Sequence, residues 1–276
     1  MPLVHLILTA LVTLTAARPV SLNPRVVGQK FFASQSNALS LNDGVGAGVD
    51  VYTHYTGDGS AAASWPAMTH WVSFQQMFDT NAEIMKHACT NIFQMPDGSD
   101  TTDPEIGLIW NAIQAAATSS GVDHRFILAV MMQESQGCVR VWRTVSGNGN
   151  PGLMQDHEGL HDCNPAGRGD YSRIVNPCPA DKITGMVQEG VGGTAAGAGL
   201  AEYLNNAVSH GQAAGVANMD GGNSQVYYQA ARNYNSGSVD WANLDNGFSS
   251  DPCYASNIAN RLTGWVRAAQ GCNPGW

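Results

Sequence analysis

Residues 121–135 read GVDHRFILAVMMQES, and this stretch decides the fold that the sequence predicts. Its apolar side chains recur with the period of an α-helix at Phe126, Ile127, Val130 and Met131. Asp123 is a typical N-cap residue, and Gly137 comes close enough behind to stop the helix. We therefore predict a helix that starts after Asp123 and buries one face.

Glu134 lies on that same apolar face, one turn after Val130 and two turns after Ile127. A carboxyl group there loses part of its hydration, which raises its pKa. A general acid that cleaves a glycosidic bond must still hold its proton near neutral or mildly acidic pH, so the position favours an acid catalyst. The alternative is a glutamate at a helix end that turns to solvent just before Gly137.

Helical patterns continue on both sides of this stretch. The expected helices include the face formed by Trp71, Phe74, Met77 and Phe78, a helix opened by Asp103-Pro104, and segments near 182–189, 197–208, 224–232 and 255–269. No segment alternates in the manner of a strand ladder. The sequence therefore predicts a mainly α fold with long loops held by disulfides.

Six cysteines favour three disulfides in an exported chain. Short loops suggest the pairs Cys163–Cys178 and Cys253–Cys272, which leaves Cys89–Cys138. None of the six lies in a CxxC pair, so neither a zinc ribbon nor a thioredoxin-like site is expected.

The N-terminus predicts secretion. An apolar run from Leu6 to Leu14 precedes the small residues Thr15-Ala16-Ala17, so we expect a signal peptide over 1–17 and an extracellular protein without membrane contact after its removal. An N-terminal membrane anchor is the alternative. Residues 18–63 are rich in Gly, Ser, Asn and Asp clusters and predict a flexible arm, ahead of one domain over 64–276.

The chain is acidic, with 22 Asp and Glu against 13 Lys and Arg and a net charge of −9. This balance argues against binding nucleic acid, which requires a basic surface. It also opposes long-range attraction to an anionic polymer such as a bacterial wall, an opposition that acidic pH would reduce.

Three motifs occur in order: the helix ending in Glu134-Ser135, the turn Gly152-Leu153-Met154-Gln155, and the run 231–237, ARNYNSG. Together they resemble glycoside hydrolase family 23, the lytic transglycosylases and goose-type lysozymes, over roughly residues 103–237. The resemblance implies a lysozyme-like, mainly α domain over 64–276, in which the catalytic acid is Glu134.

The resemblance also implies roles for the neighbouring residues. Tyr234 would place its hydroxyl near the carboxyl of Glu134 and orient it, while Ser135 would support the glutamate from behind. Met154 and Gln155 would line the sugar groove, with the Gln155 amide reaching an acetamido group or the catalytic carboxyl. The simpler interpretation makes Tyr234 a packing residue and Met154 part of the core. Asn235 is a candidate substrate contact, although Asn-x-Gly is also typical of a turn.

The second carboxylate is where the sequence departs from the family. Goose-type enzymes carry an aspartate in the loop before the Gly-Leu-Met-Gln turn, and residues 146–151 contain none. Asp156 is the remaining candidate base, since an inverting hydrolase needs a carboxylate about 6.5–9.5 Å from the acid. Without such a base, an N-acetyl sugar can use its own acetamido group or hydroxyl as nucleophile, and we favour this substrate-assisted route.

We therefore expect a monomeric enzyme without a cofactor that cleaves β-1,4 bonds of an N-acetylated polysaccharide. Peptidoglycan is the favoured substrate, and chitin is the alternative because it presents the same acetamido group. A non-catalytic glycan-binding protein on a lysozyme scaffold is a further alternative. The motifs leave open whether the products carry anhydro or reducing ends.

One motif points to different chemistry. His157-Glu158-Gly159-Leu160-His161 matches HExxH, which binds zinc in peptidases when both histidines share a helix face. Glu189 could act as a third ligand. Gly159 within the motif, with Cys163 and Pro165 just after it, argues against such a helix, so a polar loop without metal is expected.

Overall fold

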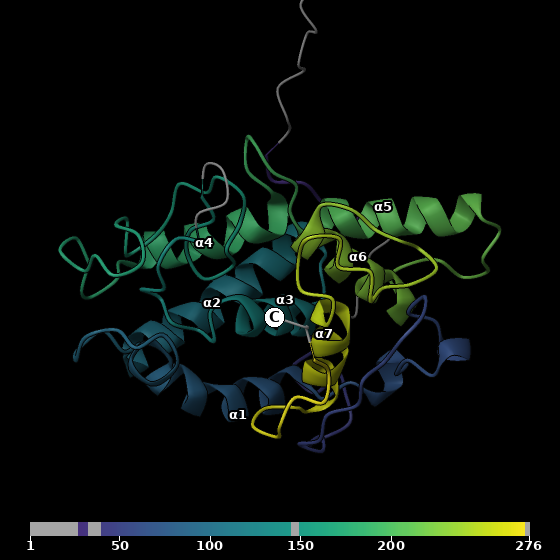
Figure 1. The fold of residues 1–276 in the computed structure, drawn as a ribbon, viewed down its shortest axis with the longest axis horizontal. Coiled ribbons are helices and arrows are strands. Elements are labelled where there is room, and N and C mark those ends of the chain that lie inside the picture. Colours follow the sequence, from purple (N-terminus) through teal and green to yellow (C-terminus); the bar gives the residue numbers. More distant parts are fainter. Residues whose placement is uncertain (1–26, 33–39, 145–148, 274–276) are drawn as a thin grey trace, which may run out of the picture.

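The computed structural model describes residues 27–32, 40–144 and 149–273, so the predicted signal peptide lies outside the described residues. Within these ranges the chain forms seven α-helices and, besides helices, only two isolated β-bridges (Figure 1). The helices are α1 (Phe74–His87), α2 (Asp103–Ser120), α3 (His124–Glu134), α4 (Ala180–Gly192), α5 (Leu200–Ala213), α6 (Ser224–Ser236) and α7 (Tyr254–Thr263). The prediction of a mainly helical fold is confirmed.

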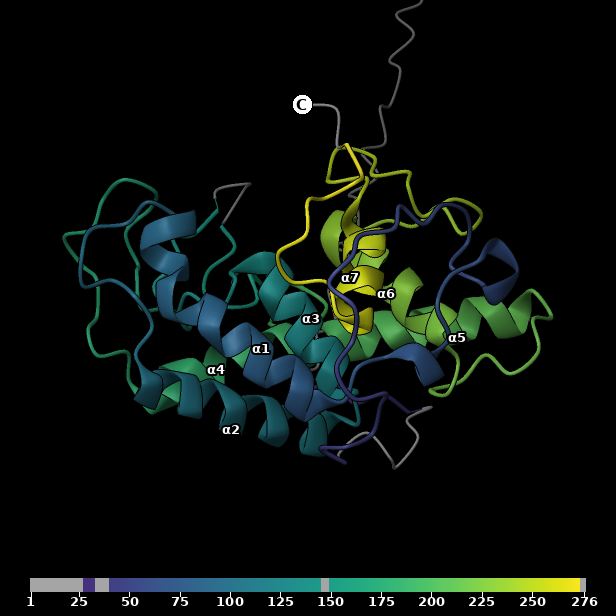
Figure 2. The same ribbon diagram turned by 90° about the horizontal axis from the view of Figure 1, so that it is seen from below.

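The central element is α3, which lies among the other helices in both views (Figures 1 and 2) and packs against α1, α2 and α7. Every residue from His124 to Met132 is buried. The sequence predicted one buried face, but the helix is covered all round, as its nearly unbroken apolar run allows. Because α3 is held on all sides, its last residue, Glu134, has a fixed position.

Caps and glycines set the helix ends. Asp123 caps α3 as predicted, with its carboxylate accepting a hydrogen bond from the backbone N–H of Arg125. Helix α2 is instead capped by Thr102, one residue before the predicted Asp103, in a capping box with Glu105. Helix α7 ends at Thr263, earlier than the predicted 269, because Gly264 adopts a left-handed conformation with φ 113°.

All three predicted disulfides are confirmed: Cys89–Cys138, Cys163–Cys178 and Cys253–Cys272. Such bridges are typical of exported proteins, although secretion itself stays a prediction. No described helix combines the length and the apolar character that crossing a bilayer requires.

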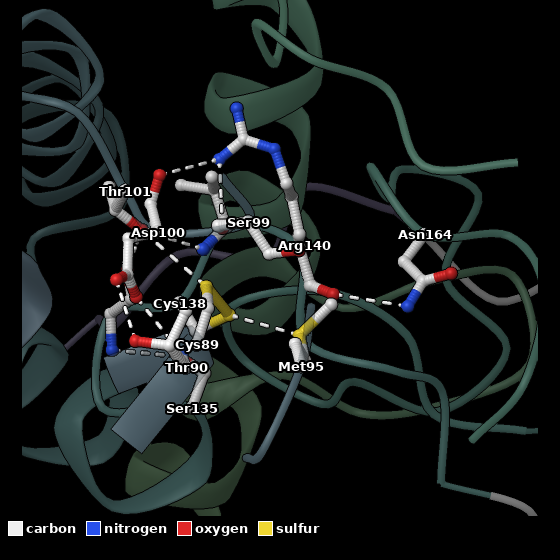
Figure 3. Close-up of a disulfide and its surroundings, with 12 residues drawn as sticks. Cys89, Thr90, Met95, Ser99, Asp100, Thr101, Ser135, Cys138, Arg140 and Asn164 are labelled. Atoms are coloured by element: carbon white, nitrogen blue, oxygen red, sulfur yellow. Dashed lines mark hydrogen bonds between the residues drawn. A yellow bond between two sulfur atoms is a disulfide. The ribbon is translucent and has the colours of Figure 1, made fainter. Parts of the chain in front are cut away.

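The Cys89–Cys138 bridge ties the chain just after α3 to the π-helical turn η3 (Ala88–Ile92) (Figure 3). Beside it, the Thr101 hydroxyl donates to the carbonyl oxygen of Gly137 at 2.9 Å. Arg140 donates to the backbone oxygens of Ser99 and Asp100 and forms a buried ion pair with Glu105 of α2. These contacts anchor the segment that follows Glu134.

The flexible arm predicted over 18–63 is wrong for residues 40–63, which pack against the helices. The hydroxyl of Tyr52 donates to Asn257 of α7 at 2.7 Å, and the backbone of Thr53 both donates to and accepts from the Asn260 amide. Asn257 and Asn260 are one turn apart, so one face of α7 satisfies the polar groups of this segment. Residues 18–26 and 33–39 lie outside the described residues.

Candidate active site

A cleft of about 590 Å³ lies where the C-terminal ends of α3 and α6 meet three loops. Glu134 enters it from the end of α3, while Tyr234 and Asn235 enter from α6. Gln155 ends the Gly-Leu-Met-Gln turn, and Asp156 follows it directly. The structure thus brings together five of the seven residues that the sequence assigned to the site.

Glu134 is half-buried at the wall of this cleft. The pKa of its carboxyl is raised to about 7, mainly by burial and in part by the nearby charge of Asp251, against the lowering effect of a hydrogen bond from Tyr254. The carboxyl therefore holds its proton throughout mildly acidic pH, as the apolar face of the sequence predicted.

Tyr254, rather than Tyr234, orients this carboxyl. Its hydroxyl donates to Oε1 of Glu134 at 2.5 Å, whereas the Tyr234 hydroxyl donates to the carbonyl oxygen of Met154 at 2.8 Å. The role that the resemblance gave to Tyr234 is therefore wrong in this detail. Tyr254 opens α7 directly after Cys253, whose disulfide fixes that end of the helix. No motif in the sequence marked it.

The Gly-Leu-Met-Gln turn holds its own side chains in place. Met154 is fully buried under α4, so the prediction that its side chain lines the groove is wrong and it belongs to the core. Gln155 does line the cleft, but its amide oxygen accepts from the Thr144 hydroxyl at 2.8 Å. Its amide nitrogen donates to the backbone of Gly152 at 3.0 Å. The Gln155 amide therefore braces the turn, without a hydrogen bond to Glu134.

The remaining two predicted substrate contacts are engaged within the protein. Ser135 is fully buried, and its hydroxyl donates to the Met131 carbonyl and accepts from the backbone N–H of Gly137. It closes the end of α3 and does not reach the cleft. Asn235 faces the cleft, and its amide oxygen accepts a hydrogen bond from the guanidinium of Arg232.

Asp156 is a second carboxyl group at this cleft, 3% exposed. Neither of its carboxylate oxygens has a hydrogen-bond partner among the described residues. Burial raises its pKa well above the ordinary value, and the charges of Glu189 and Glu134 raise it further. A buried carboxyl without donors favours its neutral form, which cannot accept a proton from water.

Asp251 is a carboxylate that the sequence analysis missed. It follows the cleft residues Ser249 and Ser250, and its charge contributes to the raised pKa of Glu134. Its own carboxylate accepts from the backbone N–H of Cys253 at 2.9 Å, at the start of α7. In the sequence Asp251-Pro252 looks like an ordinary turn, so only the folded chain places it near the acid.

Comparison of the chain with protein-family models, with curated proteins and with solved structures gave no match. Membership of glycoside hydrolase family 23 therefore stays a prediction from the three motifs.

The HExxH segment does not form the helix that a zinc peptidase requires. Residues 157–161 form turns, with Glu158 in a left-handed conformation at φ 53°. The Nδ1 of His161 lies 2.8 Å from Glu189, which also accepts from the backbone N–H groups of Leu160 and His161. The polar loop expected from Gly159 accounts for this geometry, since two histidines outside a helix do not share a helix face.

One other group of possible metal ligands occurs among the described residues, formed by Asp43, Asp123 and His124. Nε2 of His124 lies 2.7 Å from Asp43, and the guanidinium of Arg125 lies 2.6 Å from Asp123. A guanidinium inside the group is poorly compatible with a cation, so we interpret it as a buried ion-pair network.

Proposed function

We propose that the chain is a secreted enzyme that cleaves β-1,4 bonds of an N-acetylated polysaccharide, with peptidoglycan as the favoured substrate. The observation that carries the proposal is the carboxyl of Glu134, which lines an open cleft and has a pKa raised to about 7. A perturbed carboxyl in a cleft is typical of a general acid.

In the proposed reaction Glu134 donates its proton to the glycosidic oxygen as the bond from that oxygen to the anomeric carbon breaks. Tyr254 holds Oε1, so Oε2 carries the proton that is transferred. The oxygen leaves as a hydroxyl, and positive charge develops on the sugar ring. The Glu134 carboxylate formed in this step then acts as the base for the second half of the reaction.

The neutral state favoured for Asp156 supports the substrate-assisted route over direct attack by water. A base must be ionised to take a proton, and burial opposes ionisation of Asp156. The nucleophile is then the acetamido oxygen or a hydroxyl of the sugar itself. Attack by the hydroxyl gives an anhydro sugar, and attack by the acetamido group followed by water gives a reducing end.

The raised pKa of Glu134 favours a glycan-cleaving enzyme over the two alternatives from the sequence, a non-catalytic glycan-binding protein and a zinc peptidase. A non-catalytic glycan-binding protein has no use for a carboxyl that keeps its proton near pH 7. A zinc peptidase needs the HExxH helix, and residues 157–161 form turns. Chitin remains the alternative substrate, because the same proton transfer would cleave it.

The test is the isosteric variant Glu134→Gln, assayed on purified peptidoglycan and on chitin oligosaccharides. The matched control is Glu83→Gln, which changes an exposed glutamate paired with Lys86 on α1. We expect Glu134→Gln to lose cleavage while it still binds the glycan, and Glu83→Gln to keep full activity. Mass spectrometry of the products identifies the substrate and the type of end. Cleavage by Glu134→Gln at the wild-type rate would refute the proposal.

A further inference from the structure

A smaller pocket, of about 210 Å³, lies between α1, the C-terminal end of α7 and residues 47–50. It shares no lining residue with the cleft. Two arginines, Arg261 and Arg267, line it, together with Asp50 and the polar side chains of Thr80 and Asn81. The chain as a whole carries a net charge of −9, so two arginines in one pocket are a local concentration of positive charge.

Arg261 is a buried cation without a carboxylate against it. Its side chain is 5% exposed, and the guanidinium lies over the Trp265 ring, 4.7 Å from the centroid. Nε donates to the amide oxygen of Gln133 at 3.0 Å, and the described hydrogen bonds use no other nitrogen of this guanidinium. Burial lowers the pKa of Arg261 to about 10, as expected for a buried guanidinium that no carboxylate contacts.

Two of the other buried arginines have a carboxylate partner, since Arg125 pairs with Asp123 and Arg140 pairs with Glu105. The guanidinium of Arg232 instead donates from both terminal nitrogens, to backbone oxygens and to Asn235. None of the ion pairs among the described residues includes Arg261. A buried charge without a counter-charge is costly, so an anion that accepts hydrogen bonds from the remaining donors of Arg261 would reduce this cost.

The remaining charges of the pocket define which anion fits. Arg267 is exposed and adds a second positive charge. Asp50 is held in place by backbone N–H groups of Val266, Arg267 and Ala268, at 2.7, 3.0 and 3.1 Å. Two cations and one fixed anion leave the pocket with one net positive charge, which matches a singly charged ligand better than a dianion.

We propose that this pocket binds a carboxylate group, held by the guanidinium of Arg261 with Arg267 at the entrance. The planar fork of an arginine forms two parallel hydrogen bonds with a carboxylate, and the Trp265 ring packs against this guanidinium. The volume suits a small carboxylic acid or the carboxyl end of a longer molecule. The proposal is independent of glycan cleavage.

The experiment titrates the chain with sodium acetate and follows its thermal unfolding, with ionic strength held constant by sodium chloride. A parallel titration uses sodium phosphate at neutral pH. We expect a saturable rise in Tm with acetate and a weaker effect of phosphate. Arg267→Gln and Arg261→Lys should each raise the acetate Kd by about tenfold, because the first removes a charge and the second the fork.

Arg173→Gln is the matched control, since Arg173 is exposed and contacts the Pro165 carbonyl away from this pocket. It should bind acetate like the wild type. Arg267 is exposed, so Arg267→Gln decides the test even if Arg261→Lys fails to fold. The absence of saturation, an unchanged Kd in Arg267→Gln, or tighter binding of phosphate than of acetate would each overturn the proposal.

Discussion

An acidic side chain lies at each end of α3, and the two are in opposite electrostatic settings: Asp43 of the preceding segment at one end and Glu134 at the other. At the N-terminal end, burial alone would raise the pKa of Asp43, but a hydrogen bond from His124 and the charge of Arg125 lower it below its ordinary value. At the C-terminal end, burial outweighs the hydrogen bond from Tyr254 and raises the pKa of Glu134 to about 7. Compensated charges hold the helix in place at one end, and an uncompensated carboxyl is available for chemistry at the other.

The largest effect on stability is expected from a substitution at the N-terminal end of α3, where the buried charges are paired. Asp123→Ala leaves the buried Arg125 without its closest partner and removes the cap of α3, so the free energy of unfolding should fall by about 3–5 kcal/mol. Glu134→Gln should not lower it at pH 6, because an amide of the same shape replaces a carboxyl whose ionisation is opposed by burial. Urea unfolding of both variants measures the contrast. Equal losses would mean that the two ends of the helix do not differ in this way.

A smaller effect follows from Tyr254→Phe at the uncompensated end. Removing the hydrogen bond to Glu134 should lower kcat/KM about tenfold, since one such bond is worth roughly 1–1.5 kcal/mol. The bond favours the charged carboxylate, so its loss should also move the alkaline limb of the pH profile, near pH 7, to higher pH.

Tyr234→Phe is the control for this shift. It removes a hydroxyl that donates to the Met154 carbonyl, so the midpoint of the alkaline limb should stay in place. If the midpoint moved equally in both variants, the assignment of the orienting role to Tyr254 alone would be wrong.

The pH dependence of stability should differ in sign between the two ends. Because the pKa of Glu134 is raised from 4.5 to about 7, its contribution is fully present below 4.5 and is lost as pH rises through about 7. The wild type should therefore lose stability relative to Glu134→Gln over that window. Asp43 has a lowered pKa, so its contribution is present above 3.8 and is lost at lower pH. Urea midpoints across this pH range, with Asp43→Asn as the second variant, measure both slopes.

The smallest effect is expected for Asp156→Asn. If Asp156 is neutral in the working enzyme, an amide of the same shape should lower kcat by less than about threefold, far below the 10²–10⁴-fold typical of a lost catalytic base. Rate measurements on peptidoglycan decide between the two. A large loss, with an unchanged urea midpoint, would identify Asp156 as the base.

The sequence by itself predicted the mainly helical fold, the three disulfides and the position of Glu134 on a buried helix. Apolar periodicity and the Asp123 cap are local properties, so they placed the start of α3 correctly and put Glu134 on a buried face. Short loops between cysteines were enough to predict all three disulfides. The burial of Glu134 follows from the same periodicity, which explains why its raised pKa could be anticipated.

Only the tertiary structure decided which side chains meet the carboxyl of Glu134. Tyr254 and Asp251 are more than a hundred residues from Glu134 in sequence, and no short-range pattern reports such an approach. The packing of residues 40–63 likewise depends on asparagine side chains of α7, distant in sequence. Periodicity predicts which face of an element is buried, whereas the partners on that face are set by how the elements pack in three dimensions.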